Sequence, residues 1–219
     1  MSGKILLILV IVMMSMEGLD MANDKEIILP GPITKGNVSL EEAIFKRHSR
    51  REFKRKDLSL EQVGQLLWAA QGITAKQGGF NFRAVPSAGA LYPLELYALT
   101  KNGLYHYIPE GHKLENLLDK DLRAVLARAA LGQGAVAQGA LDIVICAVYE
   151  RVILKYGQRG TRYAHIEAGH AAQNIHLQAA ALGLGSVPIG AFNDDAVKKC
   201  LLLPAACEPL YIIPVGYSE

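Results

Sequence analysis

The apolar and polar positions of the chain sort most clearly between Tyr163 and Leu182. At the 3.6-residue period of a helix they form two stripes, and the apolar one is almost entirely alanine. Such a thin surface lets another helix or a sheet approach closely, so we predict a central, mostly buried helix of about five turns that ends at Gly183. The apolar stripe consists of Ala164, Ala168, Ala171, Ile175, Ala179 and Leu182, and the polar stripe of Tyr163, Glu167, His170 and Asn174.

Capping signals predict the other helices. Ser39-Leu40-Glu41-Glu42 and Ser59-Leu60-Glu61-Gln62 each have the pattern of a capping box. The first opens a helix towards Lys46 or Arg47, and the second opens a helix over residues 60–71 with an apolar face. Two further helices are predicted over residues 121–131 and, capped by Asn193, up to Leu203.

Apolar runs and turn residues predict the strands. Residues 94–99 and 103–107 form a hairpin across an Asn-Gly turn. Residues 141–149 are the most apolar run and should lie at the centre of the sheet, and residues 210–216 supply the last strand. Residues 25–38 are expected to be an extended arm, and residues 132–139 a linker. Few strands among several helices predict an α+β fold in one domain over residues 25–219.

The first residues have a different pattern. Lys4 precedes an apolar run that is shorter than the roughly 20 residues needed to span a bilayer. The run is typical of a signal-peptide core, although no small-x-small cleavage site follows it. We therefore expect residues 1–24 to direct export to the periplasm or to form a weak membrane anchor. The alternative is a cytoplasmic enzyme that starts at a later methionine such as Met21.

Composition and spacing exclude several functions. A formal charge of +2 with dispersed basic residues argues against a nucleic-acid surface. His165 and His170 lie about 140° apart on a helix, so a metal site is not expected. Cys200 and Cys207 are predicted to be unpaired core thiols, with a bridge in an oxidising compartment as the alternative. No nucleophile elbow and no dinucleotide fingerprint is present.

Basic residues gather directly after the first predicted helix, in Arg47-His48-Ser49-Arg50-Arg51-Glu52-Phe53. Arg47 and Arg51 would fall on the same side of either a helix or an extended segment. Two guanidiniums and the Ser49 hydroxyl could hold a phosphate by charge-assisted hydrogen bonds. The alternative is a solvated basic helix end that complements the helix dipole.

Four segments in this order resemble the nitroreductase-like flavoproteins, and among them the SagB-type dehydrogenases that include azoline oxidases. They are the basic segment at residues 47–53, Leu66-Leu67-Trp68-Ala69-Ala70-Gln71-Gly72, Pro86-Ser87-Ala88-Gly89-Ala90-Leu91-Tyr92-Pro93, and the stretch from Gly169 to Gly190. Many nitroreductases carry Asn and Gln where this chain has Ala90 and Tyr92, which is consistent with the SagB-type branch. They also place basic residues after the last strand, where this chain has Tyr217-Ser218-Glu219.

The resemblance implies FMN bound at the interface of a homodimer, with the alanine stripe at the dimer seam. By the same resemblance, Arg47, His48, Ser49 and Arg51 would bind the cofactor's phosphate and ribityl chain. The residues that would line the flavin from the partner subunit are Pro86, Ser87, Ala88, Gly89, Ala90 and Leu91. Pro188, Ile189 and Gly190 would lie along its ring.

Lys155-Tyr156 matches the pair proposed in azoline oxidases to take a proton while the flavin takes the hydride. A lysine suits that task only when burial lowers its pKa. The alternative is a lysine on a surface loop. Three functions therefore stay open: a SagB-type dehydrogenase, a broad nitro or quinone reductase that uses NAD(P)H, and a non-catalytic flavin-holding subunit of a biosynthetic complex.

Overall fold

A seven-stranded sheet forms the centre of the protein in the computed structural model, which describes residues 26–218. The strand order is β1-β6-β5-β4-β7-β9-β8, and every neighbouring pair is antiparallel. The strands are β1 Glu26–Ile28, β4 Leu94–Thr100, β5 Gly103–Ile108, β6 Lys113–Leu118, β7 Leu141–Val148, β8 Gly185–Ser186 and β9 Cys207–Gly216. The β4–β5 hairpin was predicted correctly, and β7 lies inside the sheet between β4 and β9, next to the middle strand β4.

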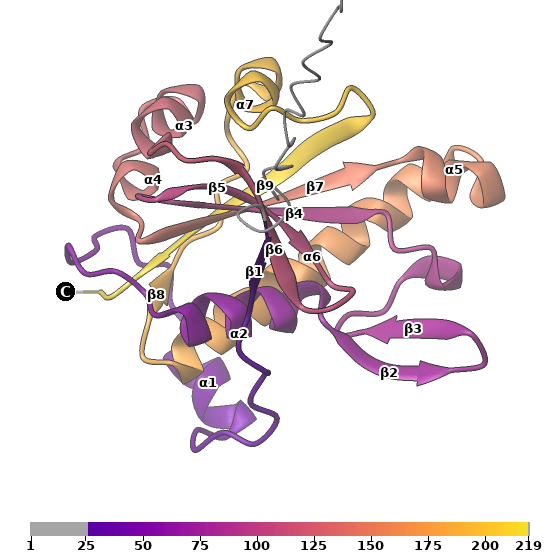
Figure 1. The fold of residues 1–219 in the computed structure, drawn as a ribbon, viewed down its shortest axis with the longest axis horizontal. Helices are drawn as coiled ribbons and strands as arrows, with labels where there is room; N and C mark the ends of the chain where they lie inside the picture. The colour runs from indigo at the N-terminus through magenta and orange to yellow at the C-terminus, as the bar shows by residue number, and fades with distance from the viewer. Residues whose placement is uncertain (1–25, 219) are drawn as a thin grey trace, which may run out of the picture.

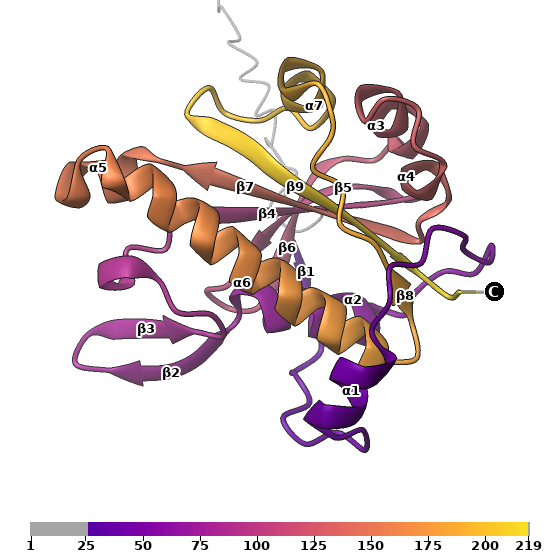
Figure 2. The same ribbon diagram turned by 180° about the vertical axis from the view of Figure 1, so that it is seen from behind.

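Helices cover both faces of the sheet (Figure 1). The helices α3, α4 and α7 lie on one face, and α1, α2 and α6 lie on the other, as the reverse view also shows (Figure 2). The helices are α1 Leu40–Lys46, α2 Leu60–Gln71, α3 Arg123–Ala129, α4 Gly134–Gln138, α5 Glu150–Tyr156, α6 Arg159–Ala181 and α7 Asp194–Cys200. The predicted α+β fold is confirmed.

Strand β7 shows why its sequence is a continuous apolar run. Ile143 and Ile145 belong to the hydrophobic core beneath α2 and α6, whereas Val144 and Cys146 belong to the core beneath α3 and α7. Successive side chains of a strand point to opposite faces, so a strand with helices on both faces has no solvent side to mark with polar residues. Cys200 and Cys207 are buried and free, as predicted, and Cys146 is buried and free as well.

The long helix α6 has 23 residues and begins at Arg159, four residues before the predicted start. Ala164, Ala171 and Ala179 are fully buried within the single chain, where α6 packs on α2 and on the sheet. The thin surface was predicted correctly, but its role was not. The alanine stripe is covered by the protein's own core, so it cannot be the seam with a second subunit.

Several short elements escaped prediction, among them β6, β8 and α5. Residues 73–83 form a hairpin of β2 Ile73–Gln77 and β3 Phe80–Arg83, outside the main sheet. Residues 132–139 were expected to be a linker but contain α4, and part of the expected arm pairs with β6 as β1. Short edge elements bury few side chains, so they leave little periodicity in the sequence.

The serine caps differ in one respect. Ser59 and Gln62 form the complete predicted capping box. Ser39 accepts a hydrogen bond from the Glu42 amide at 3.1 Å, but the Glu42 side chain pairs with Lys46 instead of reaching back. A lysine one turn later competes for the carboxylate.

The expectation of export or membrane anchoring has to be corrected. Across residues 26–218, no helix is long and apolar enough to cross a bilayer. The apolar run on which the expectation rested, together with the proposed signal segment 1–24, lies outside the described residues.

Candidate functional site

A strained turn connects β3 to β4. Its residues Ala88–Ala90 form a single 3₁₀ turn. Gly89 has a φ of 63°, and the two non-glycine residues Ala90 and Tyr92 have φ values of 54° and 46°. Residues with a Cβ avoid the left-handed region, and they stay there only where surrounding contacts hold them.

Lys155 and Tyr156 meet this turn at Gly89. A Cβ on Gly89 would lie 2.7 Å from Tyr156 Oη and 2.9 Å from Lys155 Nζ, so an added side chain would displace the ends of these two side chains. The pair belongs to the last turn of α5 rather than to a loop. The Tyr156 ring packs edge-on against Tyr163 with centroids 5.2 Å apart, whereas Lys155 is exposed. The structure thus brings together two separately predicted groups of site residues.

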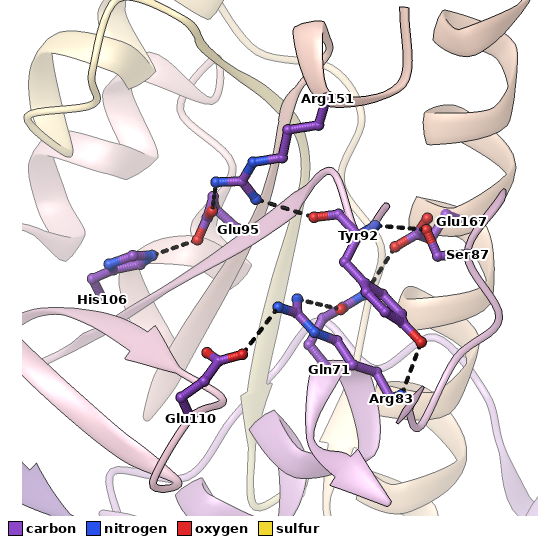
Figure 3. A network of polar contacts seen from close by, with 9 residues as sticks. All are labelled: Gln71, Arg83, Ser87, Tyr92, Glu95, His106, Glu110, Arg151 and Glu167. Carbon is purple, nitrogen blue, oxygen red and sulfur yellow. Dashed lines mark hydrogen bonds and ion pairs between the residues drawn. The ribbon is translucent and has the colours of Figure 1, made fainter. Parts of the chain in front are cut away.

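A circuit of polar side chains holds the turn on its inner side (Figure 3). Arg83 Nη1 donates to Gln71 Oε1 at 3.0 Å, and Gln71 Nε2 donates to Glu167 Oε1 at 3.4 Å. The Tyr92 amide donates to Ser87 Oγ at 2.9 Å, and the Arg83 amide donates to Tyr92 Oη at 3.2 Å. The Arg83 guanidinium also stacks on the Tyr92 ring at 4.6 Å.

Glu167 contributes the carboxyl group of this circuit. The sequence analysis placed it in the polar stripe of the helix and gave it no role. It is only 2% exposed. Burial raises the pKa of Glu167 to about 7, although hydrogen bonds from Ser87 and Gln71 and the charge of Arg83 act to lower it. The sequence signal for a buried Glu167 is its position directly before Ala168 of the alanine stripe, because a charged residue at the edge of a buried helix face is unusual. Asn174, from the same polar stripe, donates to the Ala69 carbonyl at 2.9 Å.

A second group holds the turn where β4 begins. Arg151 Nη1 donates to the Tyr92 carbonyl at 3.0 Å, and its other arm pairs with Glu95. Glu95 Oε2 lies 2.7 Å from His106 Nε2. Burial raises the pKa of Glu95, but the contacts with His106 and Arg151 outweigh it and leave that pKa below its ordinary value. Both sides of the turn are therefore fixed by ionic or polar contacts.

The basic segment lies in two neighbouring hollows. Arg47, His48 and Arg50 line a hollow of about 240 Å³ near the end of α6. Ser49 and Arg51 line a second hollow, also of about 240 Å³, which shares Arg50 and Ser218 with the first. The prediction that Arg47 and Arg51 face the same side is therefore not met, because α1 ends at Lys46 and Ser49 then forms a bridge with Ser186.

His176 lies in the wall of the first hollow and was missed in the sequence. It is 5% exposed, its Nδ1 lies 2.8 Å from Ser186 Oγ, and its buried Nε2 has no partner among the described residues. Burial, and then the positive charge of Arg47, lowers the pKa of His176 to about 4, so the ring is neutral at pH 7. If Ser186 donates to Nδ1, then Nε2 carries a proton that lacks an acceptor.

An anion that only accepts hydrogen bonds would pair with the donors that line this hollow. Two guanidiniums and an unpaired imidazole nitrogen match the oxygens of a phosphate group. The residues present thus fit the phosphate end of FMN. His48 is also held in place, since its Nδ1 contacts the Lys46 carbonyl at 2.8 Å.

The third predicted flavin segment follows β8. The backbone of Ile189 exchanges two hydrogen bonds with Ile212 of β9, at 2.9 Å and 3.0 Å. A Cβ on Gly190 would lie 3.4 Å from the Tyr211 ring. Pro188, Ile189 and Gly190 are therefore attached firmly to the sheet, and their place beside a flavin ring remains a prediction.

Comparison with known proteins gives the family. The chain belongs to the nitroreductase family, whose model matches residues 44–217. It is 42% identical over 185 residues to MJ1384 of Methanocaldococcus jannaschii, a protein assigned by name to the nitroreductases, with 82% of this chain and 91% of that protein covered. It is 28% identical over 157 residues to the microcin B17-processing protein McbC of Escherichia coli, with 67% of this chain but only 57% of McbC covered.

Solved structures show the same fold. A nitroreductase-type crystal structure from Ralstonia eutropha superposes with a TM-score of 0.78 at 30% identity, covering 90% of both chains. The E. coli microcin synthetase McbBCD complex with truncated pro-MccB17 contains a chain with a TM-score of 0.66 at 25% identity, covering 90% of this chain and 79% of that one. The nitroreductase-like fold is therefore confirmed.

Proposed function

We propose that the protein is an FMN-dependent dehydrogenase of the SagB type, which oxidises an azoline or a related small heterocycle. The observation that carries this proposal is the contact of Lys155 Nζ and Tyr156 Oη with the strained turn at Gly89. Similarity to McbC, a microcin-processing protein, supports a peptide-derived substrate.

The basic hollows supply the cofactor site. Arg47 and His48 would hold the phosphate of FMN from one hollow, and Ser49 and Arg51 from the other. When bound, FMN supplies the hydride acceptor. The turn at residues 86–91 and the segment at residues 188–190 would shape the space around the flavin ring.

Lys155 would act as the base. Conversion of an azoline to an azole removes one hydride and one proton from the ring, and the neutral amine of Lys155 takes that proton. Tyr156 would orient the substrate beside it. Lys155 is exposed in the single chain, so the base role requires the bound substrate or a partner subunit to cover it.

A homodimer would provide such a cover. Because the alanine stripe is buried, the proposed interface uses the opposite face of α6, where Ile166 is 49% exposed. Helix α1 packs on α6 and exposes Phe45 by 82% and Ile44 by 55%. Apolar side chains this exposed are typical of an interaction surface.

The test uses purified protein loaded with FMN. Lys155→Ala should abolish azoline oxidation while dithionite still reduces the bound flavin, and Lys199→Ala, at an exposed position on α7, is the matched control. Absence of flavin uptake would reject the cofactor. Unchanged azoline turnover in Lys155→Ala would reject the base assignment.

The similarity to MJ1384 favours a second candidate, a nitro or quinone reductase of broad range that uses NAD(P)H. Rapid oxidation of NAD(P)H with a quinone, equal in the wild type and in Lys155→Ala, would favour this function. Stable FMN binding without turnover on any acceptor would instead indicate a non-catalytic subunit.

A further inference from the structure

The circuit beneath the turn encloses a carboxyl that the proposed proton transfer does not use. Glu167 comes from α6, Gln71 from the end of α2, and Arg83 from the end of β3, so three separate elements meet below Ser87 (Figure 3). Gln71 is 1% exposed and Glu167 2%. Ionised groups are seldom buried without a specific role, because their desolvation is costly.

The same circuit closes around the strained residue Tyr92. The Tyr92 amide is bound by Ser87 Oγ, its hydroxyl by the Arg83 amide, and its ring by the Arg83 guanidinium. Releasing any of these contacts would let Tyr92 leave the left-handed region, where its φ is 46°. Gly89 would then move away from Lys155 and Tyr156, because it lies within the same turn.

We propose that Glu167 is a positioning residue: its carboxylate, linked to Arg83 through Gln71 and facing Ser87, keeps the 87–92 turn in the form that sets Gly89 against Lys155 and Tyr156. The catalytic consequence of this inference rests on the proposed function. The structural consequence does not.

Protonation of Glu167 would loosen the circuit. The groups that face it are Ser87 on the turn, Gln71 on α2 and Arg83 on β3, and exposed Glu110 reaches Arg83 from the far side at 3.8 Å. A carboxylate only accepts hydrogen bonds. In a protonated carboxyl one oxygen carries an O–H group that donates, so the group accepts fewer hydrogen bonds from its neighbours. With the pKa of Glu167 raised to about 7 by burial, the change falls near neutral pH.

Hydrogen exchange of the backbone amides at residues 87–92 tests the structural part on protein without added FMN. Glu167→Gln mimics the protonated carboxyl, so the wild type and the variant should exchange alike at pH 5.5. At pH 8.5 the wild-type turn should exchange about tenfold more slowly, the effect of roughly one hydrogen bond to a charged group. If the wild type and Glu167→Gln exchanged at the same rate at pH 5.5 and again at pH 8.5, the proposal would be overturned. It would also be overturned if the ratio of their rates were the same at both pH values.

Glu110→Gln is the matched control, because it removes a carboxylate from the exposed end of the same circuit and should leave the exchange of the turn unchanged. Should Glu167→Gln fail to fold, Ser87→Ala removes the facing hydroxyl. The protection factor of its turn, which is the intrinsic exchange rate of an unstructured peptide divided by the observed rate at the same pH, should then not rise between pH 5.5 and pH 8.5 as that of the wild type does. A protection factor that still rises with pH in Ser87→Ala would contradict the proposal.

The catalytic consequence is tested by measuring azoline oxidation with FMN-loaded protein. In Glu167→Gln, kcat for azoline oxidation at pH 8.5 should fall about tenfold while the Kd for FMN stays unchanged. An unchanged kcat with altered exchange would reject the catalytic consequence alone. A wild type that binds no FMN would reject the proposed function, and the exchange measurement would still decide the role of Glu167.

Discussion

A methyl group on Gly89 would lie 2.9 Å from the side-chain nitrogen of Lys155. This proximity joins the turn before β4 to the end of α5. Because Gly89 carries no side chain, the long side chains of Lys155 and Tyr156 can lie directly over the backbone. Glycine meets two requirements there, since its φ of 63° also disfavours any residue with a Cβ.

Gly89→Ala should therefore damage the site more than the fold. The positive φ alone costs about 1 kcal/mol of folding stability. Gly78→Ala is the matched control, since Gly78 has a φ of 58° but nothing within 4 Å of an added Cβ. Urea unfolding should show similar losses in both variants, whereas azoline turnover should fall only in Gly89→Ala. Equal turnover in the two variants would contradict the proposed role of the contact.

Glu167→Gln should stabilise the protein at alkaline pH. The pKa of Glu167 is raised from 4.5 to about 7, so the native state binds the proton more tightly than the unfolded state does. Stability is therefore highest below pH 4.5 and falls as the pH rises towards 7. The variant lacks this loss, so its gain should reach at most about 3 kcal/mol at pH 8 and vanish near pH 4.

Urea denaturation of the wild type and Glu167→Gln across this pH range measures the gain. Glu110→Gln provides the comparison, because Glu110 is exposed and its removal should change stability by less than about 1 kcal/mol. A gain in Glu167→Gln that is the same at pH 4 and pH 8 would show that ionisation is not its source.

His176→Asn should weaken binding of the cofactor's phosphate. Its Nε2 has no partner within residues 26–218, and it lies beside Arg47 in the first hollow. Loss of this donor should raise the Kd for FMN about tenfold. Riboflavin, which lacks the phosphate, should bind as before. His165→Asn is the control on the same helix, since His165 is exposed and paired with Tyr149 at 2.6 Å.

Flavin fluorescence quenching gives both dissociation constants. Equal weakening of FMN and riboflavin in His176→Asn would point to a general disturbance of the fold. No weakening of either would remove His176 from the phosphate site.

Opposite faces of α6 should respond differently to substitution. Ala168 is 4% exposed, so Ala168→Leu would overpack the core and cost about 1–3 kcal/mol of stability. Ile166 is 49% exposed, so Ile166→Glu should leave the folded subunit intact but separate a homodimer into monomers. Urea unfolding measures the loss of stability in Ala168→Leu, and sedimentation velocity measures the separation into monomers in Ile166→Glu. A dimer that survives Ile166→Glu would place the interface elsewhere.

Local signals carried much of the fold. The Ser59 box and Gly72 set the ends of α2, and the apolar run of β7 indicated a strand inside the sheet, because caps and burial act over a few residues. The alanine stripe predicted a close approach to α6. What covered that stripe depended on the packing of distant elements, and it proved to be the chain's own core.

The site divides in the same way. Sequence by itself determined the residue types, namely the basic segment after α1, the turn of small residues before β4, and the Lys155-Tyr156 pair. Only the tertiary structure decided that Lys155 meets Gly89, that Arg47 and Arg51 line different hollows, and that Glu167 and His176 lie buried beside them. The physical reason is that burial and charge pairing arise between segments far apart in the chain, where no local period records them.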